Sequence, residues 1–202
     1  MENVNKALSH RQRQALITQQ IILDAARTLF LEQGYGPTTI ESISVKAGVA
    51  VSTVYSIYKN KRGILKAIRE AWHQESGQRE IYDRALGEID PQRRVELAAN
   101  ATRRQWESGA TMMTIYNSAA AVDPEAAAEL KDALGGRRAN LTNFIRESQF
   151  MLRPDLSQER AAAVYLALTQ AEVYQEFIGG FGWSPDEYEI WLADILKQQL
   201  LP

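Results

Sequence analysis

Apolar residues recur at intervals of three and four along nearly the whole 202-residue chain, and almost no segment alternates strictly between apolar and polar residues. Intervals of three and four place apolar side chains on one face of an α-helix, whereas a half-buried β-strand needs strict alternation. The pattern therefore predicts an all-α protein.

The composition is that of an ordinary folded chain, with 45% hydrophobic and 24% charged residues. Its weakly polar stretches, around residues 110–122 and 161–171, are shorter than the ~20 apolar residues that span a bilayer. The polar N-terminus also lacks the apolar core of a signal peptide. We expect a cytoplasmic protein with no membrane partner.

The chain has no cysteine, and its only histidines are His10 and His73. Disulfide scaffolds, thiol nucleophiles and Cys/His metal sites are thereby excluded, and we expect no metal and no cofactor.

Charge is unevenly distributed along the chain. Residues 1–74 carry ten Lys+Arg against five Asp+Glu, a net of +5, while residues 75–202 carry 13 against 20, a net of −7, which together give −2. A compact basic segment is the electrostatic footprint expected of a protein that contacts nucleic acid. The division also indicates two modules with different partners.

The N-terminal module begins with an apolar stripe that predicts a helix over residues 17–33 and ends at Gly34. Thr38 and Glu41 fit a capping box, which would open a second helix of about two turns.

Gly48 then supplies the positive φ of a sharp turn, and a third helix is predicted over residues 51–58. Asn60 can cap a fourth helix that ends near residues 76–77.

The rest of the chain shows longer helical patterns. Two of their starts have a capping residue followed by proline, at Asp123 and Ser184. The adjacent Gly135 and Gly136 predict a kink or break in the longest helix. The helices are expected over residues 92–108, 110–121, 124–152, 158–178 and 185–200.

Two short helices joined by a glycine turn, with a third helix to cover their apolar side, form the geometry of a helix-turn-helix. The helix over residues 51–58 directs small and hydroxyl side chains outward, which lets its backbone approach the major groove of DNA. Basic residues on both sides of the three helices are placed to reach phosphates. The alternative is a three-helix cap on a larger bundle, with Lys59 and Lys61 serving only to cap helix ends.

The order and spacing of these residues resemble the N-terminal domain of the TetR family of bacterial transcriptional regulators. The residues that carry this resemblance lie within residues 13–66: Thr38, Thr39, Ile43, Ala47, Gly48, Val49, Thr53, Tyr55, Tyr58, Lys59, Asn60, Lys61 and Leu65. The resemblance implies a homodimer that places two recognition helices in successive major grooves of a palindromic operator. It also implies four segments: an N-terminal arm (1–12), a DNA-binding domain (13–60), a connecting helix (61–77) and a ligand-binding and dimerisation domain (78–202).

Residue by residue, the family pattern and the basic flanks together predict the contacts with DNA. These residues are Arg11, Arg13, Thr38, Thr39, Val51, Ser52, Thr53, Tyr55, Lys59 and Lys61. The chain departs from the family at Ala50, where a capping Ser or Thr is frequent, and at Ile57, where a polar side chain is frequent.

In the C-terminal module, aromatic and methionine side chains could line a cavity for a small apolar ligand, although ordinary core packing explains each of them singly. The candidate pocket residues are Arg103, Trp106, Met112, Met113, Tyr116, Tyr165, Tyr174 and Phe177. The last helix presents a wide apolar face that suits a two-fold dimer or the chain's own core. The candidate dimer residues are Tyr188, Trp191, Leu192 and Ile195.

The sequence thus predicts a DNA-binding repressor that a small-molecule effector releases from its operator. One alternative is a regulator without ligand control. Another is a small helical enzyme that uses Glu172 and Glu176, but the chain has no phosphate-binding glycine loop and no nucleophile elbow. We therefore expect a protein that is not an enzyme.

Overall fold

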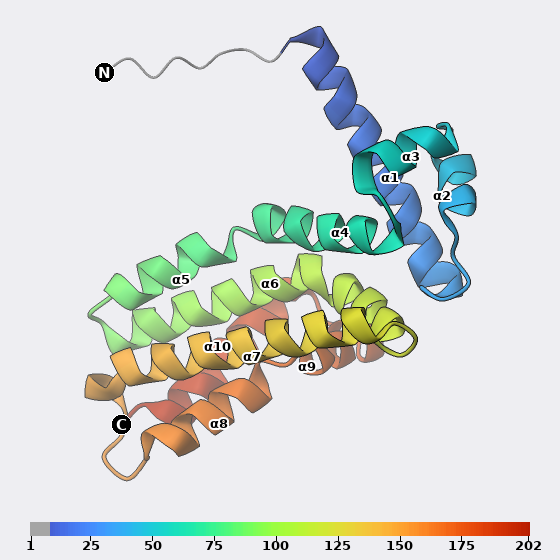
Figure 1. Ribbon diagram of the computed structural model, residues 1–202. Helices are drawn as coiled ribbons and strands as arrows, with labels where there is room; N and C mark the ends of the chain where they lie inside the picture. Colours follow the sequence, from blue (N-terminus) through green and yellow to red (C-terminus); the bar gives the residue numbers. More distant parts are fainter. Residues whose placement is uncertain (1–8) are drawn as a thin grey trace. The chain divides into compact units, whose positions relative to one another are not determined.

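The computed structural model describes residues 9–202, and every regular element in that range is a helix (Figure 1). The prediction of an all-α protein is confirmed. The chain divides into two compact units, residues 1–70 and 71–202, and the boundary falls inside helix α4 (Lys61–Ser76). Residues 1–8, most of the predicted N-terminal arm, lie outside the described residues. No helix over residues 9–202 is long and apolar enough to cross a bilayer.

Unit 1 contains α1 (His10–Gln33), α2 (Ile40–Ala47), α3 (Val51–Tyr58) and the first turns of α4. Helix α1 begins seven residues before the predicted start at residue 17. Ser9 caps it, because its hydroxyl accepts from Gln12 N (3.2 Å) while the Gln12 amide oxygen accepts from Ser9 N (2.8 Å). The first turns of α1 are exposed, so the apolar stripe could not mark where the helix begins.

The cap of α2 lies one residue later than predicted. Thr39, not Thr38, forms the capping box, and its partner is Ser42 rather than Glu41, with both bonds at 3.1 Å. Thr38 is buried and its hydroxyl donates to the Gly34 carbonyl oxygen (2.8 Å) at the end of α1. Because that carbonyl takes the Thr38 hydroxyl, the cap passes to Thr39.

The predicted helix over residues 51–58 and the predicted cap at Asn60 are both confirmed. Helix α3 spans Val51–Tyr58, and the Asn60 side-chain oxygen accepts from Gly63 N at 2.9 Å.

Unit 2 is built around α6, which contacts α5, α7, α9 and α10. Its core is formed by the apolar faces of these helices and of α8, with fully buried aromatic rings at Tyr165 and Tyr188. The elements are α5 (Gln78–Gly87), α6 (Pro91–Ala120), α7 (Pro124–Glu147), the short η1 (Gln149–Met151), α8 (Gln158–Leu168), α9 (Ala171–Gln175), the π-helical turn η2 (Glu176–Gly180) and α10 (Pro185–Leu200). Helix α5 lies where the sequence pattern predicted no element.

Two predicted interruptions at glycine are wrong. Helix α6 continues through Gly109, and α7 continues through Gly135 and Gly136. Gly109 is needed for close packing instead: a Cβ there would meet the indole nitrogen of Trp72 at 2.5 Å. The Trp72 indole N–H donates to the Gln105 carbonyl oxygen (3.2 Å), which holds the ring against α6.

One predicted helix, over residues 158–178, is interrupted. Helix α8 ends at Leu168, Gln170 is extended with φ −70° and ψ 152°, and α9 begins at Ala171. The Thr169 hydroxyl donates to the Tyr165 carbonyl oxygen (2.7 Å), a bond of the kind that competes with helix continuation. The break gives the centre of unit 2 a backbone carbonyl group with no helical partner.

Gly109 packs closely against a side chain and Gly135 does not, so replacing each with alanine should change the stability of the protein in opposite directions. Gly109→Ala forces a Cβ into the Trp72 indole and should lower the free energy of unfolding by about 1–3 kcal/mol. Gly135→Ala meets nothing within 4 Å and should raise it by roughly 0.5–1 kcal/mol, because alanine is the better helix former. Urea unfolding of both full-length variants measures the difference. A Gly109→Ala protein as stable as the Gly135→Ala protein would contradict the packing role of Gly109.

Candidate functional site

The turn between α2 and α3 determines how α3 is presented to solvent. Gly48 has φ 66° and ψ 31°, a left-handed conformation that glycine adopts without strain. Its N–H donates back to the carbonyl groups of Ser44 and Val45, so the chain reverses within three residues before α3 begins. This is the helix-turn-helix connection that the sequence predicted.

Helix α3 buries Val54 and leaves its polar side chains accessible. Ser52 and Tyr55 are exposed, and Val51 and Thr53 are half-buried. The N-cap position is Ala50, which has no side-chain hydrogen bond to the first turn. The first N–H groups of α3 therefore have no side-chain cap and, with the positive end of the helix dipole, favour an anion such as phosphate.

Tyr58 at the end of α3 ties this helix to α1. Its hydroxyl donates to the Gln19 carbonyl oxygen at 3.2 Å, and burial raises the pKa of Tyr58 to about 12. The phenol therefore stays a neutral donor at physiological pH and holds α3 on α1.

The predicted basic residues of unit 1 fall into two groups. Arg11, Arg13 and Lys59 are exposed. Lys61 is half-buried, and its ammonium group donates to the carbonyl oxygens of Tyr35 (2.7 Å), Gly36 (3.1 Å) and Thr38 (2.9 Å). The same nitrogen lies 4.2 Å from the centre of the Tyr35 ring.

Lys61 therefore joins the start of α4 to the turn between α1 and α2. It holds together three carbonyl groups that belong to no helical ladder. The sequence favoured a phosphate contact for Lys61, with the capping of a helix end as the alternative, and did not indicate these three carbonyl groups.

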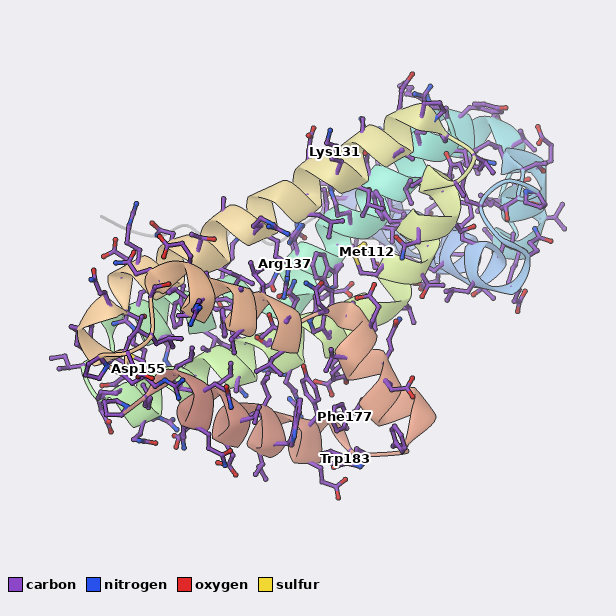
Figure 2. The ribbon with its side chains drawn as sticks, turned by 90° about the horizontal axis from the view of Figure 1, so that it is seen from below. Met112, Lys131, Arg137, Asp155, Phe177 and Trp183 are labelled. Atoms are coloured by element: carbon purple, nitrogen blue, oxygen red, sulfur yellow. The ribbon has the colours of Figure 1, made fainter. Side chains whose placement is uncertain are left out.

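The predicted pocket residues of unit 2 lie in or against its core. Trp106, Met112, Tyr116, Tyr165 and Tyr174 are buried, and Met113 and Phe177 are half-buried. Figure 2 shows Phe177 and Trp183 close together near one end of this unit, with ring centres 4.5 Å apart.

Arg103, the predicted basic pocket residue, is surrounded by acidic side chains. Its guanidinium lies 3.2 Å from Glu107, 2.6 Å from Asp186 and 3.9 Å from Glu189. Its charge is therefore already neutralised within the chain.

Sequence reasoning missed Arg137, whose side chain leaves α7 toward the interior of unit 2 (Figure 2). It donates to the Thr169 hydroxyl oxygen (2.9 Å) and carbonyl oxygen, and its carbon Cζ lies 5.2 Å from the centre of the Trp106 ring. The signal was available: Arg137 lies four residues before Leu141 and seven before Phe144, in phase with the buried face of α7. A charge in that phase is unusual and points to a buried cation.

The candidate dimer residues divide between core and surface. Tyr188 and Leu192 are fully buried within the chain, and Trp191 and Ile195 are half-buried. Ile190, which was not predicted, is 64% exposed on the same helix.

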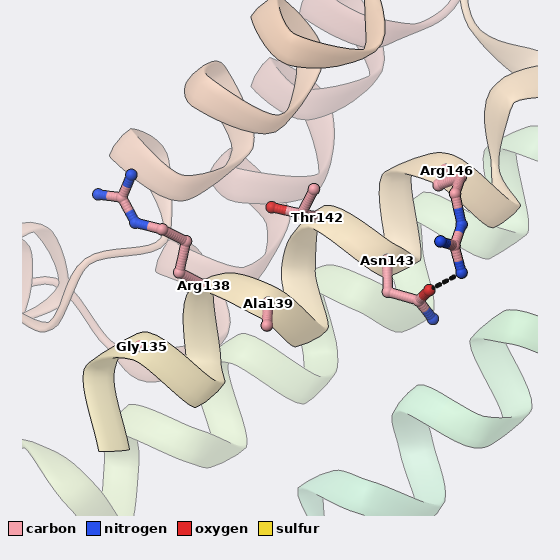
Figure 3. A pocket seen from close by; sticks show the side chains of 6 residues that line it. All are labelled: Gly135, Arg138, Ala139, Thr142, Asn143 and Arg146. Carbon is pink, nitrogen blue, oxygen red and sulfur yellow. Dashed lines mark hydrogen bonds between the residues drawn. The ribbon is translucent and has the colours of Figure 1, made fainter. Parts of the chain in front are cut away.

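Unit 2 also has a shallow hollow of about 440 Å³ on the outer face of α7, shown in Figure 3. It is lined by residues of that helix alone: Gly135, Arg138, Ala139, Thr142, Asn143 and Arg146. None of the predicted pocket residues lies there. Over residues 9–202, no group of acidic, histidine or cysteine side chains is arranged to hold a metal ion.

The three helices and glycine turn of unit 1 define a protein with a helix-turn-helix domain. Residues 22–68 match the family model described as bacterial regulatory proteins, tetR family. The uncharacterized HTH-type transcriptional regulator YvkB of Bacillus subtilis is 41% identical over 51 residues. That alignment covers 25% of this chain and 27% of YvkB, so the chain matches about a quarter of this curated relative.

Solved structures match over nearly the whole length. The SmeT–triclosan complex superposes with a TM-score of 0.71, 22% identity and coverage of 92% of each chain. NalD, the secondary repressor of the MexAB-OprM multidrug efflux pump in Pseudomonas aeruginosa, superposes with a TM-score of 0.69, 21% identity and coverage of 94% of this chain and 98% of NalD. At these identities the likeness shows a shared fold.

Residues 22–68 are therefore similar to the N-terminal domain of the TetR family of bacterial regulatory proteins, and the rest of the chain shares the fold of solved regulators.

The contacts of Lys61 predict a loss of stability when its charge is removed. Lys61→Met leaves three carbonyl groups without their ammonium donor, and should lower the free energy of unfolding by about 1–3 kcal/mol. Urea unfolding followed by circular dichroism measures this loss. Lys46→Met is the matched control: Lys46 forms only an exposed pair with Glu32 at 3.6 Å, worth at most ~1 kcal/mol. Equal stability of the two variants would contradict the role assigned to Lys61.

Because α3 has no side-chain cap, adding one should make the protein more stable. Ala50 already has the extended backbone of an N-cap residue, with φ −67° and ψ 143°. Ala50→Ser adds a hydroxyl that can accept from the first turn, and should raise the free energy of unfolding by about 0.5–1 kcal/mol. The measurement is the urea midpoint, compared with that of the unchanged protein, whose Ala50 has no acceptor. No gain from serine over the unchanged alanine would contradict the missing cap.

Proposed function

We propose that the chain is a DNA-binding transcriptional regulator whose recognition helix is α3. The observation that carries this proposal is the tight turn at Gly48, which leaves Ser52 and Tyr55 exposed on a short helix with no side-chain cap. Small polar side chains at the start of a helix suit close approach to base edges in the major groove. The net charge of +5 over residues 1–74 favours the same partner.

The residues predicted to contact DNA differ in how exposed they are, and we propose different roles for them. Val51, Ser52 and Thr53 are proposed to face base edges, and Thr39 and Tyr55 to contact phosphate or base. Arg11, Arg13 and Lys59 are exposed, and are proposed to neutralise phosphates. Thr38 is buried and Lys61 is bonded to three carbonyl groups, so any contact of theirs with DNA would act beside these internal roles.

We propose that the regulator binds a palindromic operator as a homodimer. The fold shared with NalD and SmeT over more than nine-tenths of the chain supports this. Exposed Ile190 and half-buried Trp191 and Ile195 give α10 apolar surface for an isologous contact. Two recognition helices would then lie about 34–36 Å apart, one turn of DNA.

Unit 2 is proposed to bind a small-molecule effector that releases the regulator from DNA in the bacterial cytoplasm, as a repressor. SmeT was solved with triclosan, and NalD is a repressor. An effector acts only through different affinities for the DNA-binding and the released state. Helix α4 contains the boundary between the two units and is their covalent connection.

The proposal is tested by fluorescence anisotropy with duplexes from the region upstream of the protein's own gene. Asparagine tolerates the positive φ of 67° at position 59, so Lys59→Asn removes the charge and preserves the backbone. This variant should weaken binding to every duplex, and should lower the slope of log affinity against log salt concentration by about one unit. Val51→Thr should instead change the preferred sequence.

The matched control is Lys131→Asn, an exposed lysine on α7 that should leave binding and salt slope unchanged. Sedimentation of the complex should give two chains per short operator duplex. The proposal fails if no duplex is bound at low salt, or if Lys131→Asn and Lys59→Asn weaken binding equally.

A further inference from the structure

The break between α8 and α9 gathers polar groups in the core of unit 2. The Thr169 carbonyl oxygen accepts from the Trp106 indole N–H on α6 (2.9 Å) and from Arg137 on α7. Arg137 also donates to the Thr169 hydroxyl oxygen (2.9 Å). Side chains from two other helices thus replace the helical bond that the break removes.

Arg137 is half-buried and brings a positive charge against this core without an ion pair. Over residues 9–202 it forms no ion pair, and its Nε is buried without a hydrogen bond. Burial lowers the pKa of Arg137, and the exposed Glu172 acts on it only through space. A half-buried cation without an ion pair costs free energy, and an anion bound beside it would recover that cost.

Tyr188 supplies a second unpartnered donor. The residue has 0% exposure, its hydroxyl forms no hydrogen bond, and burial raises its pKa, so it remains an O–H donor. The charge of Arg137 acts on the pKa of Tyr188 in the opposite direction to burial, and lowers it. The neighbouring hydroxyl groups are paired, because the Tyr82 hydroxyl oxygen lies 3.1 Å from that of Tyr165 and 3.3 Å from that of Thr102.

An aromatic cluster adjoins the Tyr188 ring. The ring centre of Tyr174 lies 5.0 Å away, that of Trp191 5.8 Å and that of Phe177 6.0 Å. Rings of this kind bind the apolar body of a ligand. The unpartnered Arg137 Nε and Tyr188 hydroxyl, together with aromatic rings, suit a single carboxylate on an apolar body, because hydrogen bonds to an ionised acceptor are stronger than neutral ones.

We propose that the effector of this protein is an apolar carboxylate, with Arg137 as its counter-ion and the Tyr188 hydroxyl as a second donor. The inference deepens the proposed function, since it names the chemical class of the effector. Arg103, the basic residue singled out from the sequence, does not compete for this role because three acidic side chains surround it.

The test is calorimetric titration of the full chain without DNA, using probes that share a body and differ in charge. Phenylacetate, phenylacetamide and phenethylamine form one series, and octanoate, octanamide and octylamine form the other. The carboxylate of at least one series should bind about tenfold or more tightly than its amide and amine, since hydrogen bonds to a charged group are worth more than neutral ones.

The variants assign that preference to residues. Arg137→Gln should reduce carboxylate affinity about tenfold or more while leaving the amide unchanged, and Arg137→Lys should retain part of the preference. Tyr188→Phe should weaken the carboxylate several-fold. The matched control is Arg138→Gln, the exposed neighbour on α7, which should change neither probe.

Three results would overturn the inference: equal affinity for carboxylate, amide and amine; unchanged carboxylate affinity in Arg137→Gln; or no carboxylate binding at about millimolar concentration, where even weak complexes form. If Arg137→Gln does not fold, Arg137→Lys and Tyr188→Phe decide the question. Because the titration contains no DNA, carboxylate binding without any operator binding would sustain the site and reject the proposed function.

Discussion

Backbone carbonyl groups at the ends and breaks of helices need hydrogen-bond donors, and long polar side chains supply them throughout this protein. Lys61 serves three carbonyl groups beside α2, and Arg94 serves those of Glu88 and Glu147. Arg137 and Trp106 serve the carbonyl group of Thr169. An unpaired buried carbonyl costs roughly 1–3 kcal/mol, so these donors stabilise the helix ends and breaks that they reach.

The same requirement gives similar basic residues different tasks. Lys61 is committed to the fold of the DNA-binding domain, whereas Lys59 two residues earlier is exposed. In unit 2, Arg103 is neutralised by acidic residues, whereas Arg137 keeps its charge in the core. Whether a cation can serve a ligand depends on what else its side chain already binds. The partners of each basic side chain are set by the tertiary structure.

Much of the DNA-binding domain could be predicted because its signals are local. The turn at Gly48, the bounds of α3 and the cap at Asn60 each depend on residues within one or two turns of each other. The start of α1 was missed because its first turns are exposed and carry no apolar stripe. The cap of α2 was misplaced by one residue because Thr38 and Thr39 are equally suited to it, and a carbonyl group of α1 decides between them.

In unit 2 the decisive contacts join residues far apart in the chain. Gly109 looked like a helix end because the ring that requires it belongs to Trp72. The break at Thr169 looked like continuous helix because its donors come from α6 and α7.

The sequence by itself determined the helical fold, the basic N-terminal module and the resemblance of that module to the TetR family, because periodicity, charge and turn residues are properties of neighbouring positions. Only the tertiary structure decided which half-buried arginine has no ion pair and which apolar residues of α10 remain accessible. Burial and charge pairing depend on side chains from several helices meeting in space, and no local pattern contains that information.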